Sequence, residues 1–207
     1  MKTLPSFVGS EPWDIDPVRL AADLWPEVVF YRKQLEVIYS VERNAETYVT
    51  AGNKLGKDFV AGFICLSLFL RSLRAGRTCR IVTTSVAEHH LKVLWAEIAR
   101  FASTCRSPLL AEDGGPLGLY HLEIRRASEA SAKNPMSYLV GRVSQRGEGL
   151  AGHHADITLF VADEASGIAD VAYEMSQGWA KRMLIFGNPN NTSNFFRKGV
   201  EAGDLAA

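Results

Sequence analysis

The stretch Ala51-Gly52-Asn53-Lys54-Leu55-Gly56-Lys57-Asp58 lies between a β-like run, Thr47-Tyr48-Val49-Thr50, and an apolar run from Phe59 to Leu70. A strand, a glycine-bearing turn and a helix in this order predict a phosphate-binding loop. The first N–H groups of a helix are unpaired and carry partial positive charge, so the turn can wrap phosphate oxygens while a lysine neutralises them. Gly56 and Lys57 occupy the Gly-Lys positions of the pattern G-x-x-x-x-G-K-[ST].

Two positions of this loop depart from the pattern. Ala51 stands where the first glycine would be, with Gly52 one place later, and Asp58 stands where a Ser or Thr hydroxyl would hold Mg²⁺. A carboxylate repels a polyphosphate unless a metal ion lies between them. Taken alone, the loop is also compatible with a tight strand-to-helix turn that carries a solvent-facing lysine.

A second feature is the apolar run Leu159-Phe160-Val161-Ala162, which ends in the adjacent carboxylates Asp163 and Glu164. An NTPase needs such a pair beside its phosphate loop. Asp163 would hold Mg²⁺ or its water shell, and Glu164 would polarise the water that attacks the γ-phosphate. Strand ends of an open parallel sheet are where such ligands converge. For the pair alone, a solvent-exposed acidic turn is the competing interpretation.

The order of the elements predicts an α/β fold with a mostly parallel sheet covered by helices on both faces, because buried-type strands alternate with helices. The expected strands are 47–50, 79–85, 120–124, 138–140, 157–162 and 183–186. The expected helices are 17–24, 26–41, 59–70, 87–101 and 168–179, and the Gly-, Arg- and His-rich segment 142–154 is expected to be exposed.

Composition is that of an ordinary soluble globular protein, with 47% hydrophobic and 22% charged residues in a chain of 207. Lys plus Arg and Asp plus Glu number 23 each, so net charge neither supports nor excludes a nucleic-acid partner. Cys65, Cys79 and Cys105 are widely spaced and predict reduced, mostly buried thiols. The longest apolar run is shorter than the ~20 residues that cross a bilayer, so no membrane segment is expected.

Four segments in this order resemble the large subunit of the bacteriophage terminase, the ATPase that drives DNA into empty capsids. The resemblance runs from about Phe30 to Phe196. It rests on Phe-Tyr-Arg-Lys-Gln at 30–34, the loop at 51–57, the strand at 81–85 followed by the Trp95 helix, and the acidic pair with 184–189 and 194–196 behind it. The resemblance implies that Tyr31 and Gln34 recognise the adenine; the alternative is that Gln34 is a polar residue on a helix surface. It also implies that Asn188 senses the γ-phosphate; the alternative is an ordinary turn after a strand.

The resemblance implies ATP and Mg²⁺ as cofactors, held by the following residues. Nucleotide binding falls on Tyr31, Gln34, Ala51, Gly52, Asn53, Lys54, Leu55, Gly56, Lys57 and Asp58; the metal on Asp163 and Asp58; and catalysis on Glu164 and Lys57. Because the loop has no arginine, Arg142 and Arg146 are the candidates for a finger that acts on a neighbouring subunit, with solvated loop charges as the alternative. His153 and His154 have no third ligand at zinc-site spacing.

The same resemblance implies double-stranded DNA, a portal protein and a small terminase subunit as partners. It also implies a homo-oligomeric ring when assembled, with a monomer in isolation as the alternative, and the cytoplasm of a bacterial host. Residues 1–25 are expected to form an arm and a short helix, and 26–207 a P-loop ATPase domain without the family's C-terminal nuclease. The alternatives are a helicase-like DNA-dependent ATPase and a non-hydrolysing nucleotide-binding or interaction module, the latter motivated by Asp58 and the missing nuclease.

Overall fold

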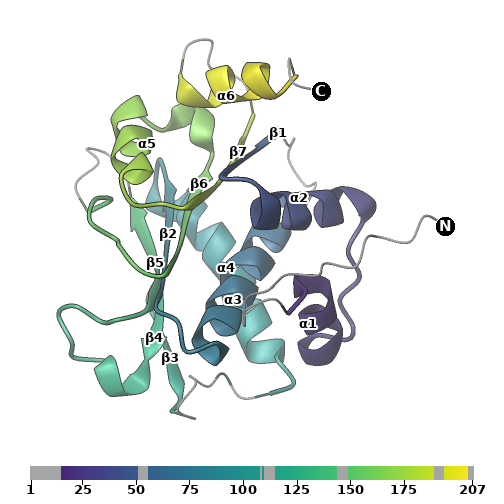
Figure 1. Ribbon diagram of the computed structural model, residues 1–207, viewed down its shortest axis with the longest axis vertical. Helices are drawn as coiled ribbons and strands as arrows, with labels where there is room; N and C mark the ends of the chain where they lie inside the picture. The colour runs from purple at the N-terminus through teal and green to yellow at the C-terminus, as the bar shows by residue number, and fades with distance from the viewer. Residues whose placement is uncertain are drawn as a thin grey trace.

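The structure is a computed structural model that describes residues 15–50, 56–107, 109, 115–143, 149–188 and 194–204. These residues form one mixed sheet of seven strands in the order β1-β7-β6-β2-β5-β4-β3 (Figure 1). The strands are β1 Glu46–Thr50, β2 Cys79–Ser85, β3 Leu117–Tyr120, β4 Glu123–Arg126, β5 Tyr138–Val143, β6 Ile157–Asp163 and β7 Arg182–Gly187. The first five in spatial order run parallel, and β4 and β3 complete the sheet as antiparallel strands.

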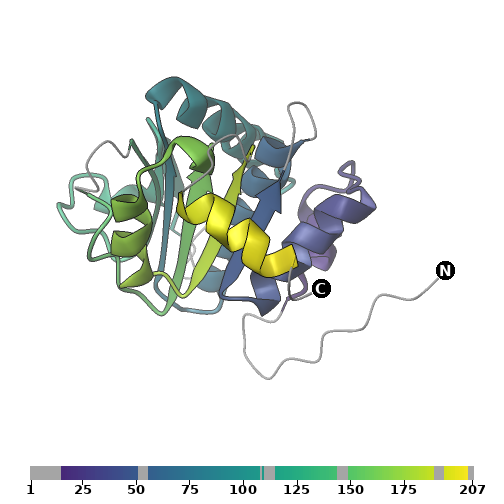
Figure 2. The same ribbon diagram turned by 90° about the horizontal axis from the view of Figure 1, so that it is seen from above.

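Helices cover both faces of the sheet, as predicted. They are α1 Pro17–Leu24, α2 Arg32–Arg43, α3 Lys57–Arg74, α4 Glu88–Thr104, α5 Asp170–Gln177 and α6 Phe195–Asp204, with the short 3₁₀ turns η1 Ala127–Glu129 and η2 Ala165–Gly167. Figure 2, seen from above, shows α3 and α4 on one side of the sheet and α5 and α6 on the other. Within the described residues, no helix has the length and apolar character needed to cross a membrane.

Two apolar cores follow from the alternation of side chains along the strands. Alternate strand residues such as Leu159 and Leu184 pack against α1, α3 and α4 in the larger core. Their neighbours Phe160 and Ile185 pack against α5 and α6 in the smaller one. The central strands are therefore apolar on both faces, which explains why β6 is buried along its whole length.

The second helix is shorter than predicted. The sequence predicts a helix from Pro26 to Val41, whereas α2 begins at Arg32. Tyr31 has an extended backbone, and its N–H donates to Oε1 of Gln34 at 3.0 Å. A glutamine three positions into a helix that accepts from the residue before the first turn fixes the helix start there.

The single strand predicted at 120–124 is wrong, because these residues span a hairpin: β3 ends at Tyr120, residues 121–122 form the turn, and β4 begins at Glu123. β3 and β4 pair in antiparallel register, with Tyr120 opposite Glu123. Leu122, in the turn, has a φ of 50°, a left-handed conformation that leucine rarely adopts. Since the sequence places no Gly, Asn or Asp in this turn, the usual signal for a tight hairpin is missing.

Candidate functional site

The carboxyl ends of the central strands meet at one edge of the sheet, and the predicted site residues gather there. Parallel register places Thr50 beside Gly187, Asp163 beside Phe186, and Thr84 beside Ala162. In an open α/β sheet this edge is the usual place for ligand-binding residues. The strand order therefore brings the end of β1, which precedes the loop, close to the acidic end of β6.

The start of α3 has the backbone that the phosphate-loop prediction requires. Gly56 precedes the helix with a φ of 73°, in the left-handed region that favours glycine. A Cβ at this position would lie 2.9 Å from Nε2 of Gln34, so a larger residue would also require the Gln34 amide to move. Lys57 is the first residue of the helix, whose unpaired N–H groups face the same edge. Residues 51–55, the rest of the predicted loop, lie outside the described residues.

Lys57 links the predicted phosphate loop directly to the acidic pair. Its Nζ lies 3.0 Å from Oδ1 of Asp163 and also bonds Oε1 of Glu164. The side chains of Lys57 and Asp163 are 11% and 3% exposed, so these charges interact with little screening by solvent. Residues that are more than a hundred positions apart in the sequence thus form one ion-paired cluster.

The electrostatics of this cluster are dominated by burial. Desolvation raises the pKa of Asp163 to about 6, although the charge and hydrogen bond of Lys57 act in the opposite direction. Desolvation also acts against the Lys57 ammonium, but the bonds and charges of Glu164 and Asp163 outweigh it and raise the Lys57 pKa. The lysine is therefore held as a cation, and Asp163 titrates closer to neutrality than an ordinary aspartate.

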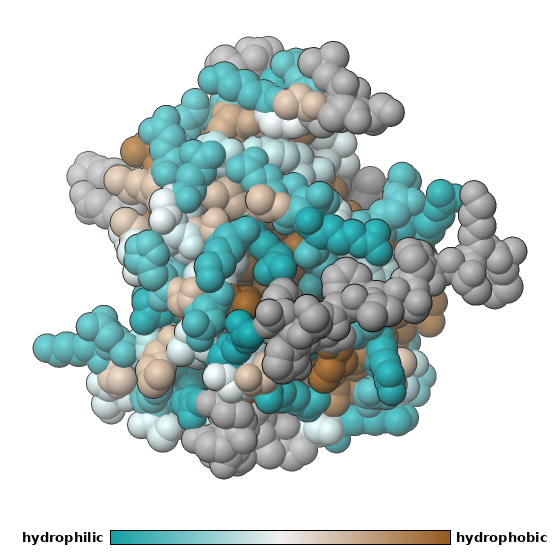
Figure 3. All heavy atoms as spheres, viewed as in Figure 1, coloured by the Kyte–Doolittle hydropathy of each residue, from teal (hydrophilic) through white to brown (hydrophobic). Residues whose placement is uncertain are grey.

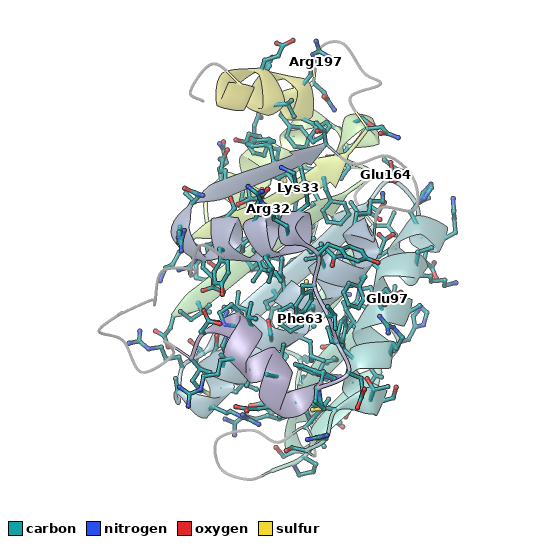
Figure 4. All side chains as sticks on the ribbon, turned by 90° about the vertical axis from the view of Figure 1, so that its right-hand side faces the viewer. Arg32, Lys33, Phe63, Glu97, Glu164 and Arg197 are labelled. Atoms are coloured by element: carbon teal, nitrogen blue, oxygen red, sulfur yellow. The ribbon has the colours of Figure 1, made fainter. Side chains whose placement is uncertain are left out.

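Glu164 has an unusual backbone conformation. Its φ of 53° and ψ of 45° place a non-glycine residue in the left-handed region. Such conformations are sparsely populated and cluster at functional sites. The surroundings are tight, since a Cβ on Gly187 at the end of β7 would lie 3.0 Å from the backbone N of Ala165. This turn directs the Glu164 side chain towards Lys57, while 27% of it remains open to solvent. In Figure 4, Glu164 lies above Glu97 on the same side of the molecule.

Asp58 is a second carboxylate that the fold leaves partly buried. Its Oδ1 is buried and has no hydrogen-bond partner among the residues that the structure describes. Burial raises the pKa of Asp58; the charge of Lys57 lowers it, and those of Glu164 and Glu97 raise it. A buried carboxylate oxygen without a donor is unfavourable unless a ligand supplies the missing contact. Asp58 therefore lies within the electrostatic reach of Lys57 and Glu164, and its role as a metal ligand stays a prediction.

A cleft of 410 Å³ runs from α2 past β1 to the start of α3. Gln34, Gly56 and Lys57 all line it. Gln34 is 7% exposed, and its Oε1 already accepts from the Tyr31 N–H, which leaves the amide NH₂ and one lone pair for a ligand. Tyr31 is 72% exposed. The structure therefore places Gln34 in the cleft and leaves Tyr31 open to solvent.

The remaining predicted residues are spread along the same edge or lie elsewhere. Asn188 follows β7 at the carboxyl edge. Arg142 is exposed near the end of β5, which β2 separates from β6. It lines a pocket with Arg80 and His153 that does not include Lys57, Asp163 or Glu164. Arg146 lies outside the described residues.

Thr84 and Ser85 lie at the carboxyl end of β2, and neither has an individual role predicted from the sequence. Both are fully buried, and in the described part of the chain neither hydroxyl has a hydrogen-bond partner. Thr84 pairs with Ala162, so the next residues, Ser85 and Asp163, lie level with each other. Strand alternation places Ser85 and Asp163 on the face of the sheet that α3 covers. Small hydroxylated residues at the end of a strand that borders the acidic strand are the sequence signal for this feature.

Asn194 connects the turn after the acidic pair to α6. Its Nδ2 donates to the carbonyl oxygens of Ala165 and Ser166 at 2.9 and 3.1 Å, and its Oδ1 accepts from the Arg197 N–H at 3.2 Å. One buried amide thus fixes the turn that follows Glu164 and caps the first turn of α6. Any displacement of that turn would be felt at the C-terminal helix.

The chain has a P-loop NTPase fold, with a mostly parallel sheet, a glycine-lysine helix start and an acidic strand end joined to that lysine by an ion pair. No protein-family model matches the chain. In sequence the chain is similar to the protein described as "Probable terminase, large subunit" of Enterobacteria phage P7, with 26% identity over 79% of this chain and 33% of that protein. The chain therefore spans about a third of the length of this curated relative.

Solved structures show the same fold. The large terminase of a thermophilic bacteriophage matches with a TM-score of 0.59 and 12% identity, over 86% of this chain and 44% of that chain. The large terminase ATPase domain of Thermus phage P74-26 matches with a TM-score of 0.50 and 18% identity, over 77% and 66%. The resemblance to terminase large subunits, noted from the sequence, and the predicted P-loop NTPase fold are both confirmed.

Proposed function

We propose that this chain is the ATPase domain of a phage terminase large subunit, and that it hydrolyses ATP with Mg²⁺ to move double-stranded DNA into a procapsid. The observation that carries the proposal is the contact of Lys57 with both Asp163 and Glu164 at the carboxyl edge of a P-loop NTPase sheet. The sequence similarity to a terminase large subunit supports the DNA-packaging part.

The chain's own residues divide the work of phosphate binding. In the structure Lys57 is paired with the acidic residues, and a triphosphate would compete for its ammonium. Movement of Lys57 to the β- and γ-phosphates frees Asp163 from its ion pair. The N–H groups at the start of α3 bind phosphate oxygens, and Gln34 in the cleft contacts the base.

The residues present fit a magnesium ion. Mg²⁺ is usually held by one or two carboxylates plus substrate phosphates, and Asp163 and the unpartnered oxygen of Asp58 are donors of this kind. In the described part of the chain, no group of three or more His, Cys, Asp or Glu side chains is arranged to hold a metal ion by itself. The nucleotide would therefore complete the coordination. When bound, Mg²⁺ neutralises the charge that develops on the transferred phosphoryl group.

Glu164 is placed to act on the attacking water. Once Lys57 leaves it, the carboxylate is free, partly solvated and held by a constrained backbone next to Asp163. We assign it the role of general base or water-orienting group. Ser85 lies level with Asp163 and offers a further buried hydroxyl for an ordered water.

The proposal extends to the rest of the motor. Arg142 or Arg146 supplies the arginine that acts on a neighbouring subunit, and Asn188 senses the γ-phosphate. Asn194, which bonds both the turn after Glu164 and the first turn of α6, transmits a conformational change from that turn to the helix. Assembly into a ring with a portal protein and a small terminase subunit, in the bacterial cytoplasm, is part of the proposal. So is the division into an arm with a short helix, 1–25, and an ATPase domain, 26–207.

The direct test is ATP binding by calorimetry together with Mg²⁺-dependent ATP hydrolysis at protein concentrations that allow assembly. We expect the folded chain to bind ATP, and ATP turnover to need Mg²⁺. The turnover rate per chain should rise with protein concentration, because the proposed arginine acts on a neighbouring subunit. A chain that binds no nucleotide would overturn the proposal. Strand separation of forked DNA by the active chain would favour a helicase over a packaging motor.

One prediction concerns pH. Because burial raises the pKa of Asp163 to about 6, we expect Mg²⁺-dependent binding of ADP to weaken as pH falls through about 6, where protonation removes the carboxylate charge. The pKa of Asp163 is higher in the folded protein than in the unfolded chain, where it is about 3.9. The contribution of Asp163 to the free energy of unfolding therefore decreases as pH rises from about 3.9 to about 6. Calorimetry of MgADP binding between about pH 5 and pH 8 measures the acid limb. The limb should disappear in Asp163→Asn, and an unchanged limb would contradict the assignment.

A second prediction concerns Asp58. Since its Oδ1 is buried without a partner, Asp58→Asn should stabilise the Mg²⁺-free protein by about 1 kcal/mol at neutral pH. Because the pKa of Asp58 is raised in the folded protein, its ionised carboxylate destabilises the fold at pH values above the pKa that Asp58 has in the unfolded chain. The stability gained by Asp58→Asn should therefore vanish in acid. The same variant should weaken the Mg²⁺ dependence of nucleotide binding roughly fivefold, whereas Asp58→Thr should keep it. Denaturant unfolding and calorimetry test this, with the exposed Asp23→Asn as control. Unchanged Mg²⁺ dependence in Asp58→Asn would show that Asp58 is no ligand.

A further inference from the structure

A pocket of 310 Å³ lies over β2, β4 and β5, on the face of the sheet opposite α3 and α4. Its floor is a row of three paired residues: Tyr138 on β5 lies between Arg80 on β2 and Arg125 on β4. Alternation along β5 brings Arg142 to the same face four positions later. Lys133, from the segment between β4 and β5, completes the lining. Figure 3 shows hydrophilic side chains at the left of the molecule, where β4 and β5 lie in Figure 1.

The pocket has a clear excess of positive charge. Arg80, Arg125, Lys133 and Arg142 line it, against the single carboxylate of Glu123. That carboxylate lies 3.5 Å from Nε of Arg125 and so compensates only one of the four cations. A surface pocket lined by one sign of charge concentrates ligands of the opposite sign. Such a lining favours an anionic ligand.

Two of the cations are fixed and two are free to bind. Arg125 donates to the carbonyl oxygens of Ala132 and Ala130 at 3.2 and 2.6 Å, and Arg80 makes longer bonds to those of Met136 and Pro135. These bonds position the guanidinium groups without neutralising them. The side chains of Lys133 and Arg142 make no hydrogen bond or ion pair with any other residue that the structure describes. The pocket thus combines a preorganised floor with two available donors.

The neutral groups in the pocket are already engaged with each other. Nε2 of His153 donates to the carbonyl oxygen of Gly149 at 2.9 Å, so its Nδ1 accepts the hydroxyl hydrogen of Tyr138. Burial lowers the pKa of His153, and the charges of Arg80 and Arg142 lower it further. The histidine is therefore neutral and structural, and the arginines and the lysine alone provide the charge for a ligand.

We propose that this pocket binds a phosphate group, at a site separate from the Lys57 nucleotide site. Phosphate oxygens accept hydrogen bonds from several guanidinium and ammonium donors at once, and arginine suits their geometry in particular. The polar lining disfavours an apolar ligand, and the volume is at the small end of ligand sites, about 300 Å³. The phosphate is a free or nucleotide phosphate, or one that protrudes from a nucleic-acid backbone. The proposal does not depend on ATP hydrolysis by the chain.

The test uses the full chain and the variants Lys133→Gln, Arg142→Gln and the double variant. Both side chains are exposed, so the fold should be retained, which circular dichroism checks. The control is Arg197→Gln on α6 (Figure 4), a partly exposed arginine whose guanidinium pairs with Glu201 and which does not line the pocket. Binding of a short fluorescent DNA duplex is followed by anisotropy over a series of salt concentrations, and binding of inorganic phosphate by calorimetry.

For a backbone phosphate, the double variant should bind the duplex about tenfold more weakly, and the slope of log affinity against log salt should fall by about 2. For a free phosphate, the double variant should instead lose inorganic phosphate binding with the duplex unaffected. Either result supports a phosphate site and identifies its source. If the double variant matches Arg197→Gln with both probes, the proposal is wrong.

Discussion

Glu164→Gln should abolish ATP turnover, with a loss of about 10²- to 10⁴-fold, while ATP binding is retained. The amide keeps the size of the side chain and its contact with Lys57, but it cannot accept a proton or hold the attacking water as a carboxylate does. Since the interaction is needed only in the transition state, the loss should fall on kcat and leave the nucleotide Kd within about twofold. Single-turnover hydrolysis and calorimetry measure the two quantities separately.

The matched control for Glu164→Gln is Glu174→Gln, which makes the same change at an exposed position on α5. The control should hydrolyse ATP at the parental rate. The free Glu164→Gln protein should also lose some stability, because one of the two carboxylates that bind Lys57 becomes neutral. Retained turnover in Glu164→Gln would exclude this residue as the base, and loss of ATP binding would show that its role is structural.

The sequence was sufficient for the features that depend on strand order and on residue type at strand ends. Lys57, Asp163 and Glu164 could be placed together because a buried strand that ends in carboxylates must, in a parallel sheet, end near the loop that follows another strand. In the structure Lys57 forms ion pairs with both carboxylates. Gln34 also reaches the cleft. Local sequence patterns were enough for these residues because all open parallel sheets bring the carboxyl ends of their strands to one edge.

The features that escaped prediction depend on tertiary contacts. The start of α2 is set by the bond between Gln34 and Tyr31, which periodicity cannot detect. Leu122 adopts the left-handed conformation although the turn contains no Gly, Asn or Asp, and its carbonyl oxygen accepts from the N–H of Gly141 on β5 at 2.8 Å. The segment 142–154 was expected to be exposed, yet Leu150 is fully buried and its carbonyl oxygen accepts from Nε1 of Trp179. A single apolar residue in a polar segment gives no periodic signal.

The second large effect is expected for Lys57→Met, which should both prevent nucleotide binding and destabilise the free protein. The lysine is the cation for the β- and γ-phosphates in the proposed site, so we expect the ATP Kd to rise by at least about a hundredfold. In the free protein its removal leaves Asp163, 3% exposed, without its partner. Breaking a buried ion pair by removing one member typically costs about 3 kcal/mol or more. Denaturant unfolding and calorimetry report the two effects.

The loss of stability in Lys57→Met should depend on pH with a definite sign. Lys57 lowers the pKa of Asp163 by its charge and hydrogen bond, so without it the pKa, already about 6, rises further. An acid whose folded pKa lies above its unfolded value destabilises the fold increasingly as pH rises between the two values. The variant should therefore be closest to the parent near pH 4 and furthest from it above neutrality. Lys92→Met, which removes an exposed lysine from α4, should change stability by less than about 0.5 kcal/mol at either pH.

The double variant Lys57→Met/Asp163→Asn separates the two roles of the lysine. Replacing Asp163 by a neutral amide removes the buried charge that Lys57→Met leaves behind, so unfolding free energy should recover most of the loss and its pH dependence should flatten. Nucleotide binding should stay absent, because no cation faces the phosphates. Recovery of stability without binding would show that the free protein holds Lys57 on its acidic residues and that nucleotide must displace this pairing. A double variant as unstable as Lys57→Met would show that the lysine stabilises the fold through its cation–π contact with the Phe186 ring instead.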